Sequence, residues 1–209
     1  MYIPKLFKND NIDDIRDFVA EHGFAILVNR TDGKLWATHI PLILGTDRNG
    51  KDILHGHIAK ANPQWKDFIS EEEVLVIFTG SHAYISSSWY DHENVPTWNY
   101  TAVHMYGSIR ILNTEELLAS LEKLVNKYET GSEHPVDVKT MSKQVINENI
   151  HGLVGFEISI SEVHSAKKLS QNRDDKNYEH IIHKLKEQNN ENATMVAKSM
   201  EQNRKKNEY

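Results

Sequence analysis

Strand-forming segments dominate the first half of the chain and constrain its fold more than any other feature. Six stretches rich in β-branched and aromatic residues are expected to form strands: FAILVNR, KLWATHIPLIL, KDILHGHI, EVLVIFTG, HAYISSSWY and TAVHMYGSIRIL. The Asp-Gly of RTDGK and the Asn-Gly of TDRNGK are typical of two-residue turns, so the first three strands should form antiparallel hairpins. The late segment GLVGFEISISEVHSAKKL alternates apolar and polar residues and predicts one more strand.

Helical patterns lie outside this run of strands. NIDDIRDFVAEHG and NTEELLASLEKLVNKYE combine cap residues with apolar stripes, a weaker helix is expected near Met141–Asn147, and two more follow Asp174. Strands and helices do not alternate regularly, which argues against Rossmann and TIM-barrel architectures, and neither GxGxxG nor GxxxxGK occurs. The predicted fold class is therefore α+β, with an antiparallel sheet or barrel and peripheral helices.

Composition and charge limit the kinds of site, the cellular location and the partners that are expected. The absence of cysteine excludes disulfides, zinc-thiolate sites and thiol nucleophiles. No apolar run approaches the roughly 20 residues of a membrane span, and the polar start does not resemble a signal peptide, so a cytoplasmic location is expected. The net charge is −6, but the segment from Lys167 onward carries 10 basic and 7 acidic residues. The acidic remainder disfavours broad nucleic-acid binding, whereas the mildly basic tail keeps that question open.

The segment LHGHIAKANPQWKDF, residues 54–68, has features of an anion site. A strand is expected to end near Ile58, and Asn62-Pro63 then offers an N-cap followed by proline at the first helical position. Helix N-termini present free backbone N–H groups to anions, and Lys60 adds a positive charge just before this end. A phosphomonoester would suit these features. An ordinary capped helix with a solvated lysine is the alternative.

Three histidines suggest a second kind of site. His55 and His57 lie two residues apart on one predicted strand, so both rings face one side, and His39 lies on a neighbouring strand. No carboxylate stands beside them, and the 12 histidines show no recognised ligand spacing, which disfavours a metal site. Contact of a histidine with a phosphate or carbonyl group is the preferred interpretation.

Pro41 interrupts the predicted strand LWATHIPLIL. A proline in a sheet must lie at an edge or a bulge, where its missing N–H does no harm. Such an edge leaves backbone groups free to hydrogen-bond a planar heterocycle. An ordinary edge strand is the alternative.

The segment ISSSWYDHENVPTWNYTAVHMY, residues 85–106, concentrates hydroxyl and aromatic side chains. Ser86 and Ser88 are expected to continue the strand that begins at His82, and their inward hydroxyls need polar partners. The absence of GxSxG disfavours a serine hydrolase. The aromatic residues, Trp98 among them, are suited to covering a barrel mouth, contacting a partner subunit or stacking on a ligand ring.

Seven motifs in consistent order resemble one family. MYIPKLF, ATHIPL, GHIAKANPQW, VLVIFTGSHAYISSSWY, VPTWNY, AVHMYG and KLSQNR together resemble the PaiB family of FMN-binding negative transcriptional regulators. The resemblance runs from Met1 to about Arg173. The helices expected after Asp174 carry no signature of the family.

The resemblance implies a split β-barrel related to pyridoxamine-phosphate-oxidase-like proteins, FMN as cofactor, and a homodimer that holds the flavin between subunits. It implies that Lys60–Asn62 meets the phosphate, that ATHIP runs beside the isoalloxazine ring, and that the SQN segment approaches from the partner. The cofactor-binding residues expected on this basis are Thr38, His39, Pro41, His57, Lys60, Asn62, Trp65, Ser86, Ser88, Trp98, Gln171 and Asn172. No catalytic or metal-ligating residue is predicted.

The expected organisation is a flavin-binding barrel, residues 1–170, followed by a C-terminal helical extension, residues 171–209. The resemblance implies a dimeric regulator that represses sporulation and degradative-enzyme genes, directly at promoter DNA or through a protein partner. A flavin-dependent oxidoreductase with a metabolic role and a flavin-binding module without turnover are the alternatives. Because FMN itself supplies redox chemistry, the lack of an evident acid–base pair does not separate them.

Overall fold

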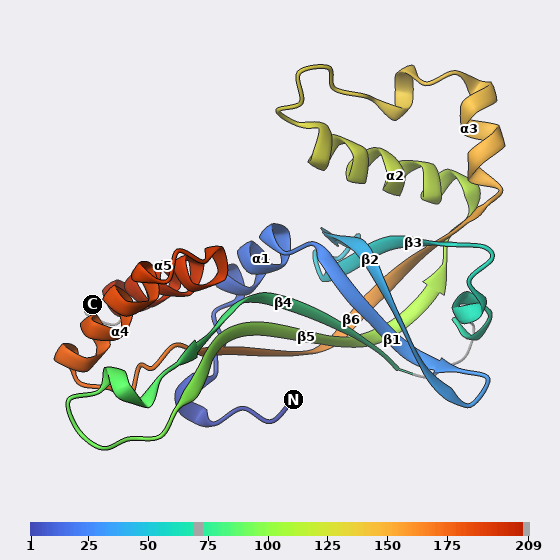
Figure 1. Cartoon of the computed structure of the whole chain (residues 1–209). Helices are drawn as coiled ribbons and strands as arrows, with labels where there is room; N and C mark the ends of the chain where they lie inside the picture. The colour runs from blue at the N-terminus through green and yellow to red at the C-terminus, as the bar shows by residue number, and fades with distance from the viewer. Residues whose placement is uncertain (69–72, 207–209) are drawn as a thin grey trace. The chain divides into compact units, whose positions relative to one another are not determined.

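The computed structural model of the protein describes residues 1–68 and 73–206 (Figure 1). The chain divides into two compact units. The barrel unit comprises Arg16–Phe78 and His104–Val163, and the helical unit comprises Met1–Ile15, Thr79–Val103 and His164–Tyr209. The domain boundary expected between residues 170 and 171 stays a prediction.

Six strands in the described part of the chain form a closed barrel in the order β1-β2-β3-β6-β5-β4. Strand β1 pairs with β2 and β4, and β3 pairs with β2 and β6, in each case antiparallel, which confirms the predicted α+β class. The strands are β1 (Phe24–Thr31), β2 (Lys34–Thr46), β3 (Asp52–Ala59), β4 (Val74–Ile85), β5 (Thr97–Ile111) and β6 (Leu153–Lys168).

The first two hairpins form where the sequence predicts them. Asp32 and Gly33 make the two-residue turn between β1 and β2, with φ angles of 54° and 74° that Gly adopts without strain and Asp tolerates. The connection from β2 to β3 is longer than the expected two residues, because Asp47 Oδ1 accepts hydrogen bonds from the backbone N–H groups of Asn49 and Lys51 and so stabilises a wider loop.

Two strand predictions are wrong in their boundaries. EVLVIFTG and HAYISSSWY were expected as separate strands, but both contribute to the continuous strand β4. Gly80 does not adopt the left-handed conformation that would favour a turn between them. The strand then ends at Ile85, and Ser87–Trp89 form the 3-10 helix η3, because the Ser86 side chain accepts a hydrogen bond from the Ser88 backbone N–H.

Five α-helices and three further 3-10 helices complete the described structure. The expected helix near residues 141–147 forms slightly later, with Ser142 as its cap. Asn113 and Glu116 form a capping box at the start of the long central helix. The elements are α1 (Ile12–Glu21), α2 (Thr114–Glu129), α3 (Lys143–Ile150), α4 (Asp175–Glu187), α5 (Glu191–Lys206), η1 (Lys5–Phe7), η2 (Pro63–Asp67) and η4 (Val138–Thr140).

Each unit has apolar side chains removed from solvent. In the barrel unit the fully buried residues include Leu27, Leu42, Leu54, Phe78 and Phe156. The helical unit contains a buried cluster in which α4 and α5 pack with the end of β4. Its members are Ala83, Ile85, Tyr90, Leu169, Tyr178, Ile181, Leu185, Ala193, Val196, Ala197 and Met200. None of the helices within the described ranges is long and apolar enough to cross a membrane.

Candidate functional site

The predicted N-cap at Asn62 is confirmed. Asn62 Oδ1 accepts a hydrogen bond from the Gln64 backbone N–H at 3.1 Å, and Pro63 occupies the first position of η2. Asn62 Nδ2 donates to Thr38 Oγ1 at 3.0 Å, so both ends of this amide are engaged within the protein. The helix is a single short 3-10 segment, and the structure gives Asn62 the role of holding the segment that follows β3.

Gln64 is the centre of a buried polar cluster that sequence reasoning missed. Its side chain is 0% exposed, and its Nε2 donates to Leu27 O at 3.2 Å and to Asn29 Oδ1 at 2.9 Å. Its Oε1 accepts from the Thr38 hydroxyl at 2.5 Å. The alternation of β1 offered a signal, because Asn29 lies on the same face as the buried Leu27 and therefore points inward.

Lys60 and Trp65 lie on the same segment and are linked to each other. Trp65 Nε1 donates to Lys60 O at 2.8 Å, and the Lys60 backbone N–H donates to Gly152 O at 2.8 Å. The Lys60 side chain is exposed and has no hydrogen-bond or ion-pair partner among the residues that the structure describes. The Lys60 ammonium group is therefore available to bind an anion, and the backbone beside it is fixed by hydrogen bonds.

The remaining predicted residues of the barrel unit do not join the Gln64 cluster. His39 is exposed and stacks on Phe24 with ring centroids 6.2 Å apart. Pro41 is the last β2 residue paired with β1, and Leu42 is the first paired with β3, so the missing N–H falls where β2 changes partner. His57 lies on the opposite strand face from the buried Ile58, and burial lowers the pKa of its ring.

His55 belongs to a charged network on the outer side of the barrel rather than to a group of histidines. Its Nε2 lies 3.1 Å from Glu157 Oε2, and Arg110 Nε donates to Glu157 Oε1 at 2.9 Å. Burial, followed by the nearby positive charge of Lys123, lowers the pKa of His55. Within the described ranges no three His, Asp or Glu side chains gather in a way that could hold a metal ion.

In the helical unit, the predicted residues form separate small groups. Ser86 Oγ and Ser88 Oγ are hydrogen-bonded to each other at 2.8 Å. Trp98 is 52% exposed, and its ring centroid lies 5.8 Å from those of both His82 and Tyr84, so three aromatic rings share this surface. Within segment 85–106, the bonded Ser86 and Ser88 hydroxyls and the exposed Trp98 ring therefore belong to separate groups of side chains.

Gln171 of the SQN segment is held by three hydrogen bonds to backbone groups. Gln171 Oε1 accepts from the Leu169 backbone N–H at 2.8 Å, and Gln171 Nε2 donates to Lys167 O and Leu6 O at 2.6 and 3.2 Å. Asn172 is exposed. Of the two predicted residues, only Asn172 keeps its side chain clear of these local contacts.

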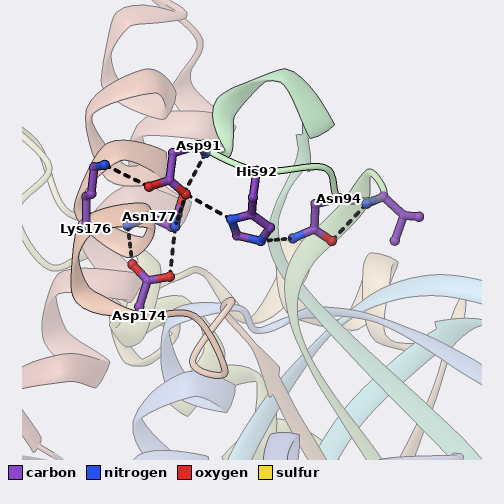
Figure 2. Close-up of polar contacts among 7 residues, drawn as sticks. Asp91, His92, Asn94, Asp174, Lys176 and Asn177 are labelled. Carbon is purple, nitrogen blue, oxygen red and sulfur yellow. Dashed lines mark hydrogen bonds and ion pairs between the residues drawn. The ribbon is translucent and has the colours of Figure 1, made fainter.

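The loop that follows η3 carries a second polar network that the sequence did not reveal (Figure 2). Asp91 accepts hydrogen bonds from Lys176 Nζ at 2.8 Å and from Asn177 Nδ2 at 2.9 Å, and lies 2.9 Å from His92 Nδ1. These donors hold the pKa of the Asp91 carboxyl well below its usual range, Lys176 having the largest effect. The contacts fasten this loop to the first turn of α4, where Asp174 is the N-cap.

Comparison with known proteins places this geometry in a family. Residues 1–162 match the family model described as "Putative FMN-binding domain". Protease synthase and sporulation protein PAI 2 of Bacillus subtilis (strain 168) is 45% identical over 209 residues, which covers 99% of each chain.

Solved structures show the same fold at low sequence identity. The flavocytochrome Anf3 from Azotobacter vinelandii is 14% identical, with a TM-score of 0.61 over 85% of this chain and 78% of that one. The FAD and heme binding protein from Mycobacterium smegmatis is 12% identical, with a TM-score of 0.57 over 77% of this chain and 73% of that one. These likenesses confirm the predicted split-barrel fold.

The family match covers more than three quarters of the chain and confirms FMN as the expected cofactor. The similarity to PAI 2 extends across the C-terminal helices as well, so it covers parts of the chain that the family model does not. The chain belongs to the PaiB family of FMN-binding proteins.

Proposed function

We propose that this protein is a homodimeric, FMN-binding regulator that lowers the expression of sporulation and degradative-enzyme genes in the cytoplasm. The observation that carries the proposal is the 45% identity with PAI 2 over 99% of both chains. The name of that relative links it to protease synthesis and sporulation. Repression takes place either directly at promoter DNA or through a protein partner.

The residues around η2 fit the phosphate of FMN. A phosphomonoester needs a cation and hydrogen-bond donors on a backbone that is already ordered. Lys60 supplies an exposed ammonium group without a partner in the described part of the chain, and the adjoining backbone is anchored by Asn62, Trp65 and Gly152. We assign phosphate contact to Lys60, whereas Asn62 and Thr38 hold the segment in shape.

The other expected flavin contacts remain proposals. His39 and Trp98 have exposed rings that can pack on a heterocycle, and Asn172 has an exposed amide. When bound, FMN supplies one- and two-electron redox chemistry, so the protein needs only to bind and orient it. A metabolic oxidoreductase is for this reason the alternative function.

The homodimer is supported by exposed aromatic residues in the helical unit. Tyr84 and Trp98 are 45% and 52% exposed and lie in edge-to-face contact. Aromatic side chains are enriched at protein interfaces, where they bury large areas with few rotatable bonds. Light scattering of the purified protein should give twice the mass of the 24.1 kDa chain. A mass of one chain at micromolar concentration would contradict the dimer.

The regulatory role is tested with promoter DNA and reduced nicotinamide in parallel. Direct repression predicts that the FMN-loaded protein shifts a promoter fragment of a protease or sporulation gene, with an affinity that falls as salt rises. Absence of a shift at low salt, together with loss of repression in a deletion strain, indicates action through a partner. FMN-dependent oxidation of reduced nicotinamide at rates of 1 per second or more, roughly the lower end for enzymes, supports the oxidoreductase instead.

A further inference from the structure

We infer that Gln64 is a positioning residue for the cofactor phosphate: its buried amide fixes the segment 60–65 so that Lys60 is held ready for the phosphate. The inference rests on the proposed function, because it takes Lys60 as the phosphate contact. It adds a residue that touches no cofactor and that lies within the motif GHIAKANPQW without being among the predicted cofactor-binding residues.

The burial of Gln64 is the first observation. A primary amide in a barrel interior is costly unless each of its polar atoms has a partner. Gln64 meets this requirement with two donated bonds, to Leu27 O and Asn29 Oδ1, and one accepted bond from Thr38. An apolar side chain of the same size would fill the space without needing these three hydrogen-bond partners. The amide therefore specifies where η2 lies, in addition to filling the interior.

The second observation is that the bonds close a ring. Gln64 accepts from the Thr38 hydroxyl, Thr38 accepts from Asn62 Nδ2, and Asn62 Oδ1 accepts from the Gln64 backbone N–H. The ring joins β2 to η2, and the bonds from Gln64 to β1 extend it across a second strand. Removal of the Gln64 amide leaves Thr38 without its acceptor, and Asn29 Oδ1 then keeps the longer bond from the Thr31 hydroxyl at 3.4 Å.

The ring is coupled to Lys60 through the backbone. Asn62 N–H donates to Ala59 O at 2.9 Å, and Trp65, which follows Gln64 directly, donates from its indole to Lys60 O. The backbone on both sides of Lys60 is thus fixed through Asn62, a member of the ring, and Trp65, the neighbour of Gln64, while the Lys60 side chain stays free. Binding an anion on such a segment avoids the entropy cost of ordering a mobile loop. The consequence is selective: loss of Gln64 should weaken contact with the phosphate and spare contact with the flavin ring.

The test compares FMN with riboflavin, which lacks the phosphate. Dissociation constants for both are measured by quenching of flavin fluorescence, and thermal unfolding establishes that each variant is folded at the temperature used. Gln64→Met keeps the side-chain length and removes the hydrogen bonds. We expect its FMN dissociation constant to rise about tenfold, because ordering the loosened segment on binding costs about 1.4 kcal/mol. The riboflavin constant should change by less than about threefold, or roughly 0.7 kcal/mol.

Two controls separate positioning from general weakening. Gln144→Met alters an exposed amide that donates a hydrogen bond to Glu148, and it should change neither constant. Leu117→Ala destabilises a different cluster of the barrel unit, packed with Leu112 and Ile150, and should leave the ratio of the two constants unchanged. Gln64→Met overturns the inference if it is folded and its ratio equals that of the wild type.

A second variant keeps the inference testable if Gln64→Met does not fold. Thr38→Val is isosteric and removes only the hydroxyl that links Gln64 to Asn62. It should lower the preference for FMN over riboflavin, and an unchanged preference would refute the positioning role. Lys60→Ala distinguishes failure of the phosphate assignment from failure of the positioning role of Gln64. If it leaves the preference unchanged, the phosphate assignment fails. If it lowers the preference and Gln64→Met does not, only the present inference fails.

Discussion

The shared core of the C-terminal helices makes a quantitative prediction. Ile181 on α4 is fully buried and packs within a cluster that includes Ile85 from the end of β4. Ile181→Ala removes three buried carbon atoms from this cluster. Core substitutions of this kind cost about 2–5 kcal/mol of unfolding free energy, because transfer energy is lost and a cavity remains. For a chain of this size that corresponds to a fall in melting temperature of about 4–20 °C.

The neighbouring residue offers a matched control. Ile182 is only partly buried and lies at the margin of the same cluster, so Ile182→Ala removes the same atoms from a wetter site. Thermal and urea unfolding of both variants, followed by circular dichroism, should show the larger loss for Ile181→Ala. Equal losses, or a loss below about 1 kcal/mol for Ile181→Ala, would refute the idea that α4 is anchored by burial of this face.

Further predictions concern acid stability and close packing. Burial lowers the pKa of His55 and His57 below the ordinary histidine value, so the unfolded chain binds more protons than the folded one. The unfolding free energy should therefore fall as pH drops from about 7.5 to about 5.5. His57→Gln should flatten this pH dependence in urea titrations, and an unchanged slope would contradict the prediction. A Cβ at Gly107 would lie 2.2 Å from Ser159 O, so Gly107→Ala should cost about 1–3 kcal/mol in thermal unfolding, whereas Gly152→Ala, whose nearest neighbour is at 3.4 Å, should cost clearly less.

Local signals predicted the fold well. The Asp-Gly turn and the Asn62-Pro63 cap each depend on residues within a few positions of one another, so they can be recognised in a sequence. The extent of β4 could not be recognised in this way. Gly80 is compatible with either a turn or a strand, and pairing with distant segments decides between them.

The site was predictable only in part, for a related reason. Lys60 and Asn62 stand beside a recognisable helix start, whereas the partners of Gln64 lie 26 to 37 positions away along the chain. No local pattern announces that a glutamine will be buried. The network around Asp91 is similar, since its partner Asn177 is 86 positions distant.

The most direct test of the account is FMN binding by Lys60→Ala beside Lys66→Ala. Both lysines are exposed, but Lys60 precedes η2, where we place the phosphate, and Lys66 lies in its last turn. Loss of one charge-assisted contact should raise the FMN dissociation constant of Lys60→Ala by about 10- to 150-fold, with the riboflavin constant little changed. Lys66→Ala should bind both flavins as the wild type does. Equal FMN affinity in wild type and Lys60→Ala would contradict the assignment of the FMN phosphate to Lys60.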